Sequence, residues 1–442
     1  MKFTFFSDCI SPHQVPLAKA LIQRLGCENY RYVYTDELDE ERKSMGWKDV
    51  LKEQGAVFIQ GDDDAPEVYK ADVLLSGHRA VGLFEKRNQL AKETWYCSER
   101  WFKPPLGFVR VFVPSYFKMA WRFVKCLKCE TFKYLPMGIH AARDMARLVS
   151  FLSGDVRCFF AAPKVAFESR PGGAIVPLKE AIKAGVLSAE EITFGKQHGF
   201  VQIPQEQWGK VEPRKVYAKM RMWGYFVAPG KESTEYTEDT EKKLTTNDTN
   251  LHEKGAARET GNWELKTRNC REGASRLRVL WVGRMLKLKC VDMLVKACTS
   301  EALKDKVELY LYGHGPEEET LKALAKDVPI YFHDFVPVEQ VRDLMRAHDV
   351  YVFSSNASDG WGAVVSEALE EGMQVFGTVE AGASGTVLPP THLFKAGDVK
   401  RLMELLMAAL PKVSIGEWTA ENGAKYLCYR DVAGITNAEV SD

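Results

Sequence analysis

The chain has 442 residues, more than one ordinary hydrophobic core takes up, so we expect two or three domains. Its 60 basic and 60 acidic residues cancel to a net charge of zero, which excludes the overall basic character of a nucleic-acid-binding protein. No apolar run approaches the roughly 18 residues that cross a bilayer, and the run at Phe3–Phe6 is too short for a signal peptide. We therefore expect a cytoplasmic protein whose ten cysteines are mostly reduced, buried thiols.

In the N-terminal part of the chain, short apolar runs alternate with longer runs that have apolar residues at helical spacing. The predicted strands are Phe3–Phe6, Ala56–Gln60, Asp72–Ser76 and Glu93–Cys97, and the predicted helices are Val15–Leu25 and Met137–Leu152. Strands that alternate with helices favour a parallel sheet covered on both faces. We assign this first α/β domain to residues 1–228.

The composition changes between Pro229 and Arg276, where Glu, Lys, Thr and Asn dominate. Such a segment buries too little apolar surface to offset the entropy lost on ordering. We therefore interpret residues 229–276 as a charged linker or loop insertion.

The alternation of strands and helices is clearer in the second half. The predicted strands are Leu277–Gly283, Val307–Gly313, Ile330–Phe332, Asp349–Ser354 and Gln374–Gly377, and the predicted helices are Asp292–Cys298, Glu317–Ala325, Val338–Ala347, Val364–Glu371 and Val399–Leu410. Successive βα units predict a doubly wound α/β domain over residues 277–410. Residues 411–442 form a C-terminal segment, with a helix at Trp418–Tyr429, that we expect to pack back on the first domain.

Two acids, Asp359 and Glu367, stand eight positions apart across the sequence Gly360-Trp361-Gly362, directly after an apolar strand. A strand that ends in glycines and opens a helix presents backbone N–H groups that attract phosphate. Carboxylates accept hydrogen bonds from sugar hydroxyls, so the pattern suits a ligand that is part phosphate and part sugar. The alternative is a helix cap at Asp359 and an ordinary surface carboxylate at Glu367.

Basic residues follow the first strand of the second half, where Gly283 and Arg284 are succeeded by Lys289. Basic side chains at the carboxyl end of a parallel strand face the crevice in which ligands bind. Arg284 can hold two phosphate oxygens at once and Lys289 adds a point charge, although a solvated basic loop is the alternative.

Two further strand ends in this half offer backbone groups. Gly313-His314-Gly315-Pro316 forms a tight turn that either cradles a phosphate or serves the fold alone. It lacks the full dinucleotide fingerprint and the lysine of a P-loop. In the segment from His333 to Pro337, Val336 is predicted to provide an apolar wall for a nucleotide base.

In the N-terminal half, four polar residues at strand ends or helix starts are candidates for the acceptor side of a site: His13, His78, Glu99 and His140. A single histidine of this kind is more often structural than catalytic. Several polar strand ends in one half are better evidence than any one of them.

The segment Arg110–Tyr134 mixes basic and aromatic residues in a pattern typical of an amphipathic helix that lies on an anionic membrane surface. A helix packed on the core with a basic outer face is the alternative. Cys126 and Cys129 form a lone CxxC pair inside the segment, and without a second pair at zinc-finger spacing we expect no metal there.

The run from Leu277 to Leu406 resembles the nucleotide-binding domain of the retaining glycosyltransferases of GT-B fold. This family, the group 1 glycosyl transferases, includes sucrose synthase and bacterial mannosyltransferases. The resemblance rests on motif order: Gly283-Arg284 with Lys289, then the turn at Gly313, then the acid pair. It implies two Rossmann-like domains facing a cleft, a nucleotide sugar linked to UDP or GDP, an acceptor that is a sugar or is lipid-linked, and no metal or other cofactor.

The resemblance also implies roles for individual residues. Those implied to be catalytic are Asp359, Arg284 and Lys289, and those implied to bind the donor are Gly283, Gly313, Val336, Gly360, Trp361, Gly362, Ala363, Val364 and Glu367. Asp359 stands where the family usually has Glu, which leaves the donor sugar open. We expect a hexosyltransferase of bacterial surface-polysaccharide or glycolipid assembly, peripheral at the inner face of the membrane. A catalytically silent sugar-nucleotide-binding protein and a nucleotide-sugar epimerase remain alternatives.

Overall fold

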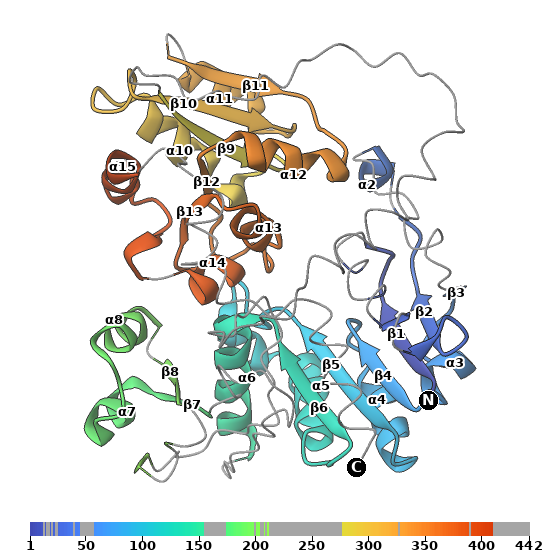
Figure 1. The fold of residues 1–442 in the computed structure, drawn as a ribbon. Coiled ribbons are helices and arrows are strands. Elements are labelled where there is room, and N and C mark those ends of the chain that lie inside the picture. Colours follow the sequence, from blue (N-terminus) through green and yellow to red (C-terminus); the bar gives the residue numbers. More distant parts are fainter. Residues whose placement is uncertain are drawn as a thin grey trace, which may run out of the picture.

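A computed structural model describes residues 1–11, 25–38, 40–44, 57–153, 174–198, 200–203, 276–325, 328–388 and 390–409, with single positions at 14, 18, 21, 22, 207, 210 and 211. These residues build two α/β domains that lie one above the other in Figure 1, each around its own parallel sheet. In the parts so described, no helix is both long enough and apolar enough to cross a bilayer.

The N-terminal sheet has six parallel strands in the order β3-β2-β1-β4-β5-β6. The strands are β1 (Phe3–Ser7), β2 (Tyr30–Tyr34), β3 (Val57–Gln60), β4 (Val73–Ser76), β5 (Glu93–Ser98) and β6 (Phe132–Pro136). The helical elements are α2 (Glu40–Ser44), α3 (Pro66–Tyr69), α4 (Val81–Gln89), η3 (Gly107–Phe112), α5 (Pro114–Cys126) and α6 (Gly138–Ser153). The central strands are almost wholly buried because apolar clusters cover both faces of the sheet.

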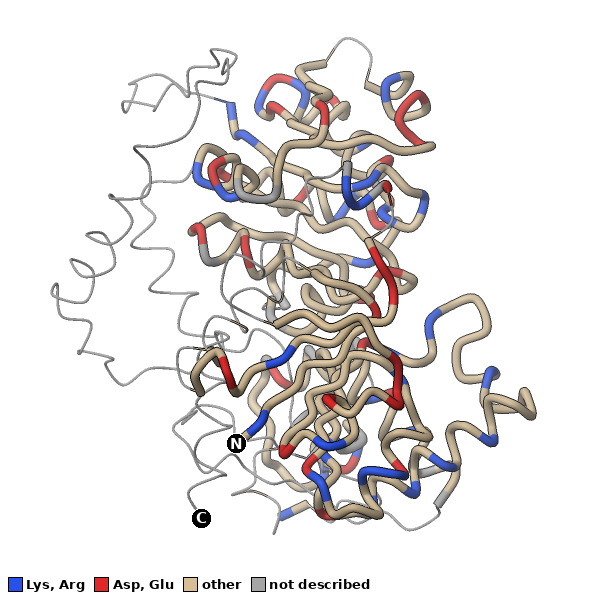
Figure 2. The backbone as a smooth tube through the Cα atoms, turned by 90° about the vertical axis from the view of Figure 1, so that its right-hand side faces the viewer, with Lys and Arg blue, Asp and Glu red and all other residues tan. Residues whose placement is uncertain are grey.

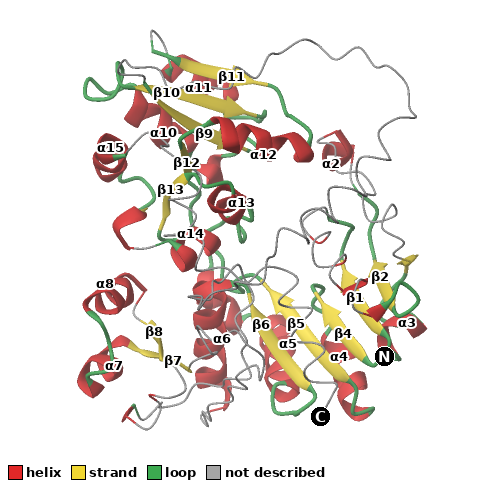
Figure 3. Cartoon of the chain, viewed as in Figure 1, coloured by secondary structure: helices red, strands yellow, loops and turns green. Residues whose placement is uncertain are grey.

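The C-terminal sheet repeats this order as β11-β10-β9-β12-β13-β14. Its strands are β9 (Leu277–Val282), β10 (Val307–Tyr312), β11 (Ile330–His333), β12 (Val350–Phe353), β13 (Gln374–Thr378) and β14 (Leu393–Phe394). The helical elements are η5 (Lys287–Lys289), α10 (Val291–Cys298), α11 (Glu318–Leu324), α12 (Val338–Ala347), α13 (Val364–Glu370), α14 (Gly382–Val387), η6 (Pro390–His392) and α15 (Val399–Ala408). Figure 3 shows how helices cover the strands of both sheets.

In each sheet the chain starts in the middle, winds to one edge, and returns to wind toward the other. The direction of winding reverses between β1 and β4 in one sheet and between β9 and β12 in the other. Open α/β sheets bind ligands beyond the carboxyl ends of the strands at this switch point. The predicted fold class, two Rossmann-like doubly wound domains, is therefore confirmed.

A smaller unit lies between the two sheets in sequence. Strands β7 (Ala174–Pro177) and β8 (Phe200–Ile203) pair in antiparallel fashion, and α7 (Leu178–Ala184) and α8 (Ala189–His198) connect them. This unit was not predicted from the sequence.

Every strand predicted from the sequence is present within one or two residues of its expected ends, but β2, β6 and β14 of the two sheets were missed. The prediction of one basic helix over Arg110–Tyr134 is partly wrong, because the helix ends at Cys126 and the chain then enters β6. Phe132 and Tyr134 are fully buried in the sheet, and Lys133 pairs with Glu93 on β5. The strand is favoured here because it places the ring of Phe132 in an aromatic cluster with Phe84 and Phe123.

Some predictions fall outside the described residues. These are most of Val15–Leu25, where only positions 18, 21, 22 and 25 are described and are helical, the insertion at 229–276 apart from Arg276, and the C-terminal segment 411–442.

The CxxC pair is described: burial raises the pKa of the Cys126 thiol to about 12, so this thiol stays protonated at neutral pH.

Candidate functional site

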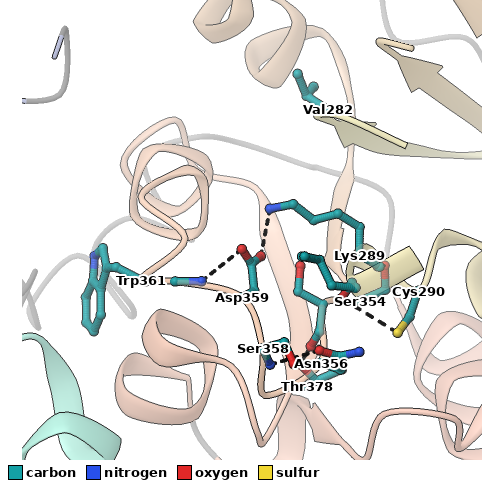
Figure 4. A network of polar contacts seen from close by, with 12 residues as sticks. Val282, Lys289, Cys290, Ser354, Asn356, Ser358, Asp359, Trp361 and Thr378 are labelled. Atoms are coloured by element: carbon teal, nitrogen blue, oxygen red, sulfur yellow. Dashed lines mark hydrogen bonds and ion pairs between the residues drawn. The ribbon is translucent and has the colours of Figure 1, made fainter. Parts of the chain in front are cut away.

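A lysine and an aspartate meet at the switch point of the C-terminal sheet. Lys289 ends the turn η5 after β9, Asp359 lies in the loop after β12, and the distance from Lys289 Nζ to Asp359 Oδ2 is 2.7 Å (Figure 4). Only 14% of the Asp359 side chain is exposed. Burial alone would raise the pKa of this carboxyl, but the charge and hydrogen bond of Lys289 outweigh it, so the pKa is lowered and Asp359 is ionised at neutral pH.

The loop after β12 holds the turn that carries Lys289. The Ser354 hydroxyl donates to the carbonyl of Lys289 at 2.7 Å, and the Asn356 N–H donates to the carbonyl of Leu288 at 2.9 Å. The Asn356 side chain in turn accepts from the N–H of Ser358, as Figure 4 shows. These contacts fix the position of the ammonium group before any ligand arrives.

The turn at Gly313 packs directly on the loop after β9. A Cβ atom at Gly313 would lie 2.0 Å from the carbonyl oxygen of Gly283, and one at Gly315 would lie 2.4 Å from that of Met285. The N–H of Met285 also donates to the carbonyl of His314 at 2.7 Å. Both glycines are thus required for loop packing, which is direct evidence for the structural alternative at this turn; a phosphate-binding role stays a prediction.

Tyr351 on β12, which sequence reasoning missed, lies beside both acids of the pair. Its hydroxyl donates to the carbonyl of Val282 at 3.4 Å. Burial raises the pKa of this hydroxyl well above its ordinary value, and the charges of Glu367 and Asp359 add to the rise. Glu367, on the first turn of α13, and Asp359 therefore both lie near the carboxyl end of β9. Arg284 is the second residue after that strand.

The two domains meet at the Gly-Trp-Gly loop. Glu99, which follows β5, accepts the N–H of Trp361 at 2.7 Å through Oε1 and pairs with Lys103 Nζ at 2.7 Å through Oε2. A Cβ atom at Gly360 would lie 2.1 Å from Glu99 Oε1, so only glycine allows this approach. The N–H of Trp361, predicted to bind the donor, is occupied here by a carboxylate of the opposite domain.

His140 also reaches the opposite domain. Its ring is buried, and Nε2 lies 2.9 Å from the carbonyl oxygen of Val379, which follows β13. The adjacent N–H of Ile139 donates to the Thr386 hydroxyl at 3.0 Å. Gly138, at φ +83°, allows the close approach of Thr386 and Trp361. These contacts give His140 a role in joining the domains, while its predicted role on the acceptor side stays untested.

His78 lies at the switch point of the N-terminal sheet, where Nδ1 bonds the Asp8 carboxylate. The hydrogen bond to Asp8 is the largest cause of the raised pKa of His78, and the same bond lowers the pKa of Asp8. His13 lies outside the described residues. Among the residues that the structure describes, no three His, Cys, Asp or Glu side chains are placed to hold a metal ion together.

The fold and the contact between the domains define a class: two doubly wound domains whose strand ends meet, which is the GT-B architecture. Residues 276–410 match the family model described as glycosyl transferases group 1. This match confirms the resemblance of the C-terminal half to that family.

Two curated relatives align with part of the chain. An uncharacterised glycosyltransferase of Methanocaldococcus jannaschii is 29% identical over 119 residues, which is 26% of this chain and 30% of the relative. A GDP-mannose-dependent monoacylated alpha-(1-6)-phosphatidylinositol monomannoside mannosyltransferase of Corynebacterium glutamicum is 31% identical over 138 residues, which is 29% of this chain and 36% of the relative. The aligned part thus spans about a third of the length of these relatives.

Solved structures of similar arrangement include Anabaena HepE in complex with UDP, with a TM-score of 0.49 and 13% identity, covering 98% of this chain and 94% of that one. Another is WaaG, a glycosyltransferase involved in lipopolysaccharide biosynthesis, with a TM-score of 0.48 and 13% identity, covering 98% of this chain and 99% of that one.

Proposed function

We propose that this protein is a glycosyltransferase that moves a sugar from a nucleotide-diphosphate donor to a hydroxyl acceptor. The observation that carries the proposal is the preformed pair of Lys289 and Asp359, held at the switch point of a domain that matches the group 1 glycosyl transferases. A fixed ammonium beside a fixed carboxylate suits a ligand with adjacent anionic and hydroxylated parts.

The proposed chemistry begins with departure of the nucleoside diphosphate. Negative charge develops on the leaving diphosphate, and Lys289 and Arg284 would stabilise it more strongly in the transition state than in the bound donor. Asp359 would accept hydrogen bonds from the donor sugar, and Glu367 from the ribose. No cofactor is assigned in this scheme, and retention at the anomeric carbon is part of the proposal.

The pairing of Lys289 with Asp359 shapes the proposed binding step. Donor phosphate must share or replace the carboxylate as the partner of Lys289, and it must displace Glu99 from the N–H of Trp361 if it is to use that group. We propose that donor binding rearranges both contacts and moves the two domains relative to one another.

The donor base and the acceptor are proposed only as classes. The relative from Corynebacterium glutamicum is named for GDP-mannose and a phosphatidylinositol mannoside, which supports a hexose donor and a glycolipid or polysaccharide acceptor. We propose a place in bacterial surface-polysaccharide or glycolipid assembly on the cytoplasmic side of the membrane.

A panel of UDP, GDP and their sugars tests this function, first by thermal shift and then by release of the free nucleotide. One base should stabilise the protein, and its sugar conjugate should release nucleotide faster when a saccharide or glycolipid acceptor is added. Nucleotide binding without turnover on any donor would favour the silent binding protein, and conversion of the donor sugar without an acceptor would favour the epimerase. Absence of binding to every nucleotide would contradict the proposal.

A further inference from the structure

The element η3 and the helix α5 carry an unusual share of the exposed apolar side chains. Of thirteen large hydrophobic residues that are exposed in the described part of the chain, six lie in this segment, from 42% to 65% exposed: Leu106, Val109, Phe112, Val113, Phe117 and Trp121. A seventh, Phe151 on α6, packs edge-on against Phe112 with ring centroids 5.6 Å apart. These seven residues form one surface, the η3–α5 patch, and single exposed apolar residues elsewhere do not form such a group.

The segment that carries the patch is rich in basic residues, of which Arg100, Lys103 and Arg122 pair with acids elsewhere. The segment from Arg100 to Lys128 holds seven Lys and Arg residues and no Asp or Glu, in a chain whose net charge is zero. In Figure 2 this segment runs along the lower right, with blue positions spread along it. Lys118, Lys125 and Lys128 are exposed, and Lys125 Nζ lies 3.3 Å from the centroid of the Trp121 ring.

The spacing along α5 separates the anchoring face from the exposed one. Ala120, Phe123 and Val124 are buried against the sheet, whereas Phe117 and Trp121, one turn apart, face outward. The helix is therefore held rigidly by its inner face, and the outward side chains are available without unfolding.

A hollow of about 490 Å³ opens between η3 and α5. Its lining is apolar apart from one guanidinium and the hydroxyl groups, and consists of Leu106, Arg110, Val113, Ser115, Tyr116 and Met119. Arg110 beside an apolar wall suits a phosphate group joined to an acyl chain.

We propose that the η3–α5 patch docks the protein on a bilayer that contains anionic phospholipid. Aromatic and aliphatic side chains flanked by lysines fit the boundary between acyl chains and anionic headgroups. A second copy of the chain is a poorer occupant, because pairing the patch with itself would bring two positive surfaces together. The segment begins directly after Glu99, which follows β5, and its Lys103 pairs with that carboxylate, so docking places the candidate site close to the lipid surface.

Co-sedimentation of the full chain with vesicles tests the proposal. The protein should bind phosphatidylcholine vesicles that contain phosphatidylglycerol, bind pure phosphatidylcholine vesicles much less, and dissociate as salt is raised. The paired change Lys118→Glu with Lys125→Glu should lower the partition coefficient about tenfold or more. Phe117→Ser with Trp121→Ser should lower it on both kinds of vesicle.

The matched controls are Lys400→Glu and Met407→Ser on α15, which alter an exposed lysine and an exposed methionine far from the patch in sequence and should leave the partition unchanged. Thermal unfolding and nucleotide binding confirm that each variant is folded. The proposal is overturned if the wild type ignores anionic vesicles at low salt, or if the controls lose binding as the patch variants do. Self-association that Phe117→Ser abolishes, without vesicle binding, would show an interface between copies instead.

Discussion

Each of the two sheets places an acid and a base across its switch point, but in opposite order. In the N-terminal sheet the acid Asp8 follows β1 and the base His78 follows β4. In the C-terminal sheet the base Lys289 follows β9 and the acid Asp359 follows β12. Members of each pair are 70 residues apart in sequence, so identical topology brings equivalent positions together. The fold therefore supplies the meeting point, and the residue types decide the chemistry.

The two switch points also differ in what holds them. In the C-terminal sheet, backbone approaches at Gly313 and Gly315 lock the loops after β9 and β10 together. In the N-terminal sheet the loops have more room: a Cβ atom at Gly77, after β4, would lie 3.6 Å from the Ser7 hydroxyl, which is an ordinary contact, and the N–H of Asp36 donates to the carbonyl of Asp8 at 2.7 Å to join the loops after β2 and β1. Loops packed backbone against backbone tolerate less change than loops with room between them, and the variant Gly313→Ala tests that contrast.

The largest effect is expected for Gly313→Ala. The residue has φ +126°, and the new methyl group would collide with the carbonyl of Gly283, so we expect a loss of about 2–4 kcal/mol in unfolding free energy. Chemical denaturation measures it, with Gly397→Ala as the control, since Gly397 also has a positive φ but has nothing within 4 Å of its Cβ position. Equal losses in both would show that backbone strain, and not loop packing, sets the cost.

Lys289→Ala should remove the base of the C-terminal pair and leave Asp359 without its main counter-charge. We expect donor binding and turnover to weaken by about 1.5–3 kcal/mol, or roughly ten- to more than a hundredfold. Calorimetric titration with the nucleotide that binds best provides the measurement. Lys287→Ala, two positions earlier on the same turn with an exposed side chain, is the control and should be near normal. Similar activity in both variants would contradict the assigned role of Lys289.

Glu99→Gln should remove a negative charge from the contact between the domains. The carboxylate occupies the N–H of Trp361, so its neutralisation should strengthen nucleotide binding by about 1 kcal/mol, or about fivefold. Glu319→Gln, an exposed acid on α11, serves as the control and should not change the affinity. Weaker binding in Glu99→Gln would indicate that Glu99 supports the ligand and does not compete with it.

The smallest effect concerns the N-terminal pair. The raised pKa of His78 means that its stabilising contribution is full below the ordinary histidine pKa of about 6.5 and is lost as pH rises through the folded value. The lowered pKa of Asp8 means that its contribution is lost as pH falls through the folded value of that group. NMR titration should find the His78 pKa above 6.5 in the wild type and lower in Asp8→Asn. An unchanged pKa in that variant would refute the pairing.

Much of the fold could be predicted because its strands are continuous apolar runs. Asp349–Ser354 and Gln374–Gly377 were recognised in this way, whereas β2 reads Tyr-Arg-Tyr-Val-Tyr and has no such run. The missed β6 interleaves Lys133 with buried aromatic residues, which also resembles a basic amphipathic helix. Only pairing with β5 decides between the two, and pairing is not a local property.

The candidate site was predicted where its signal was a short motif. The stretch from Asp359 to Glu367 and the neighbourhood of Lys289 could be recognised because glycines and charges follow a strand at fixed spacing. The contact of Lys289 with Asp359 and the approach of Glu99 to Trp361 depend on how two distant loops meet in space. No local pattern encodes such distances, so sequence reasoning named the residues without their partners.

The closeness of backbone between α6 and α14 has a mechanical consequence. A Cβ atom at Gly138 on α6 would lie 3.3 Å from the carbonyl oxygen of Gly382 on α14 and 2.5 Å from the ring of Trp361, so the two domains touch closely here. A contact of this kind can serve as the pivot for a rotation of one domain against the other, and it lies next to the Gly-Trp-Gly loop. Such a rotation would displace the outer strands β3 and β11 by far more than the loop itself, so the candidate site would move little while the outer parts of the domains move far.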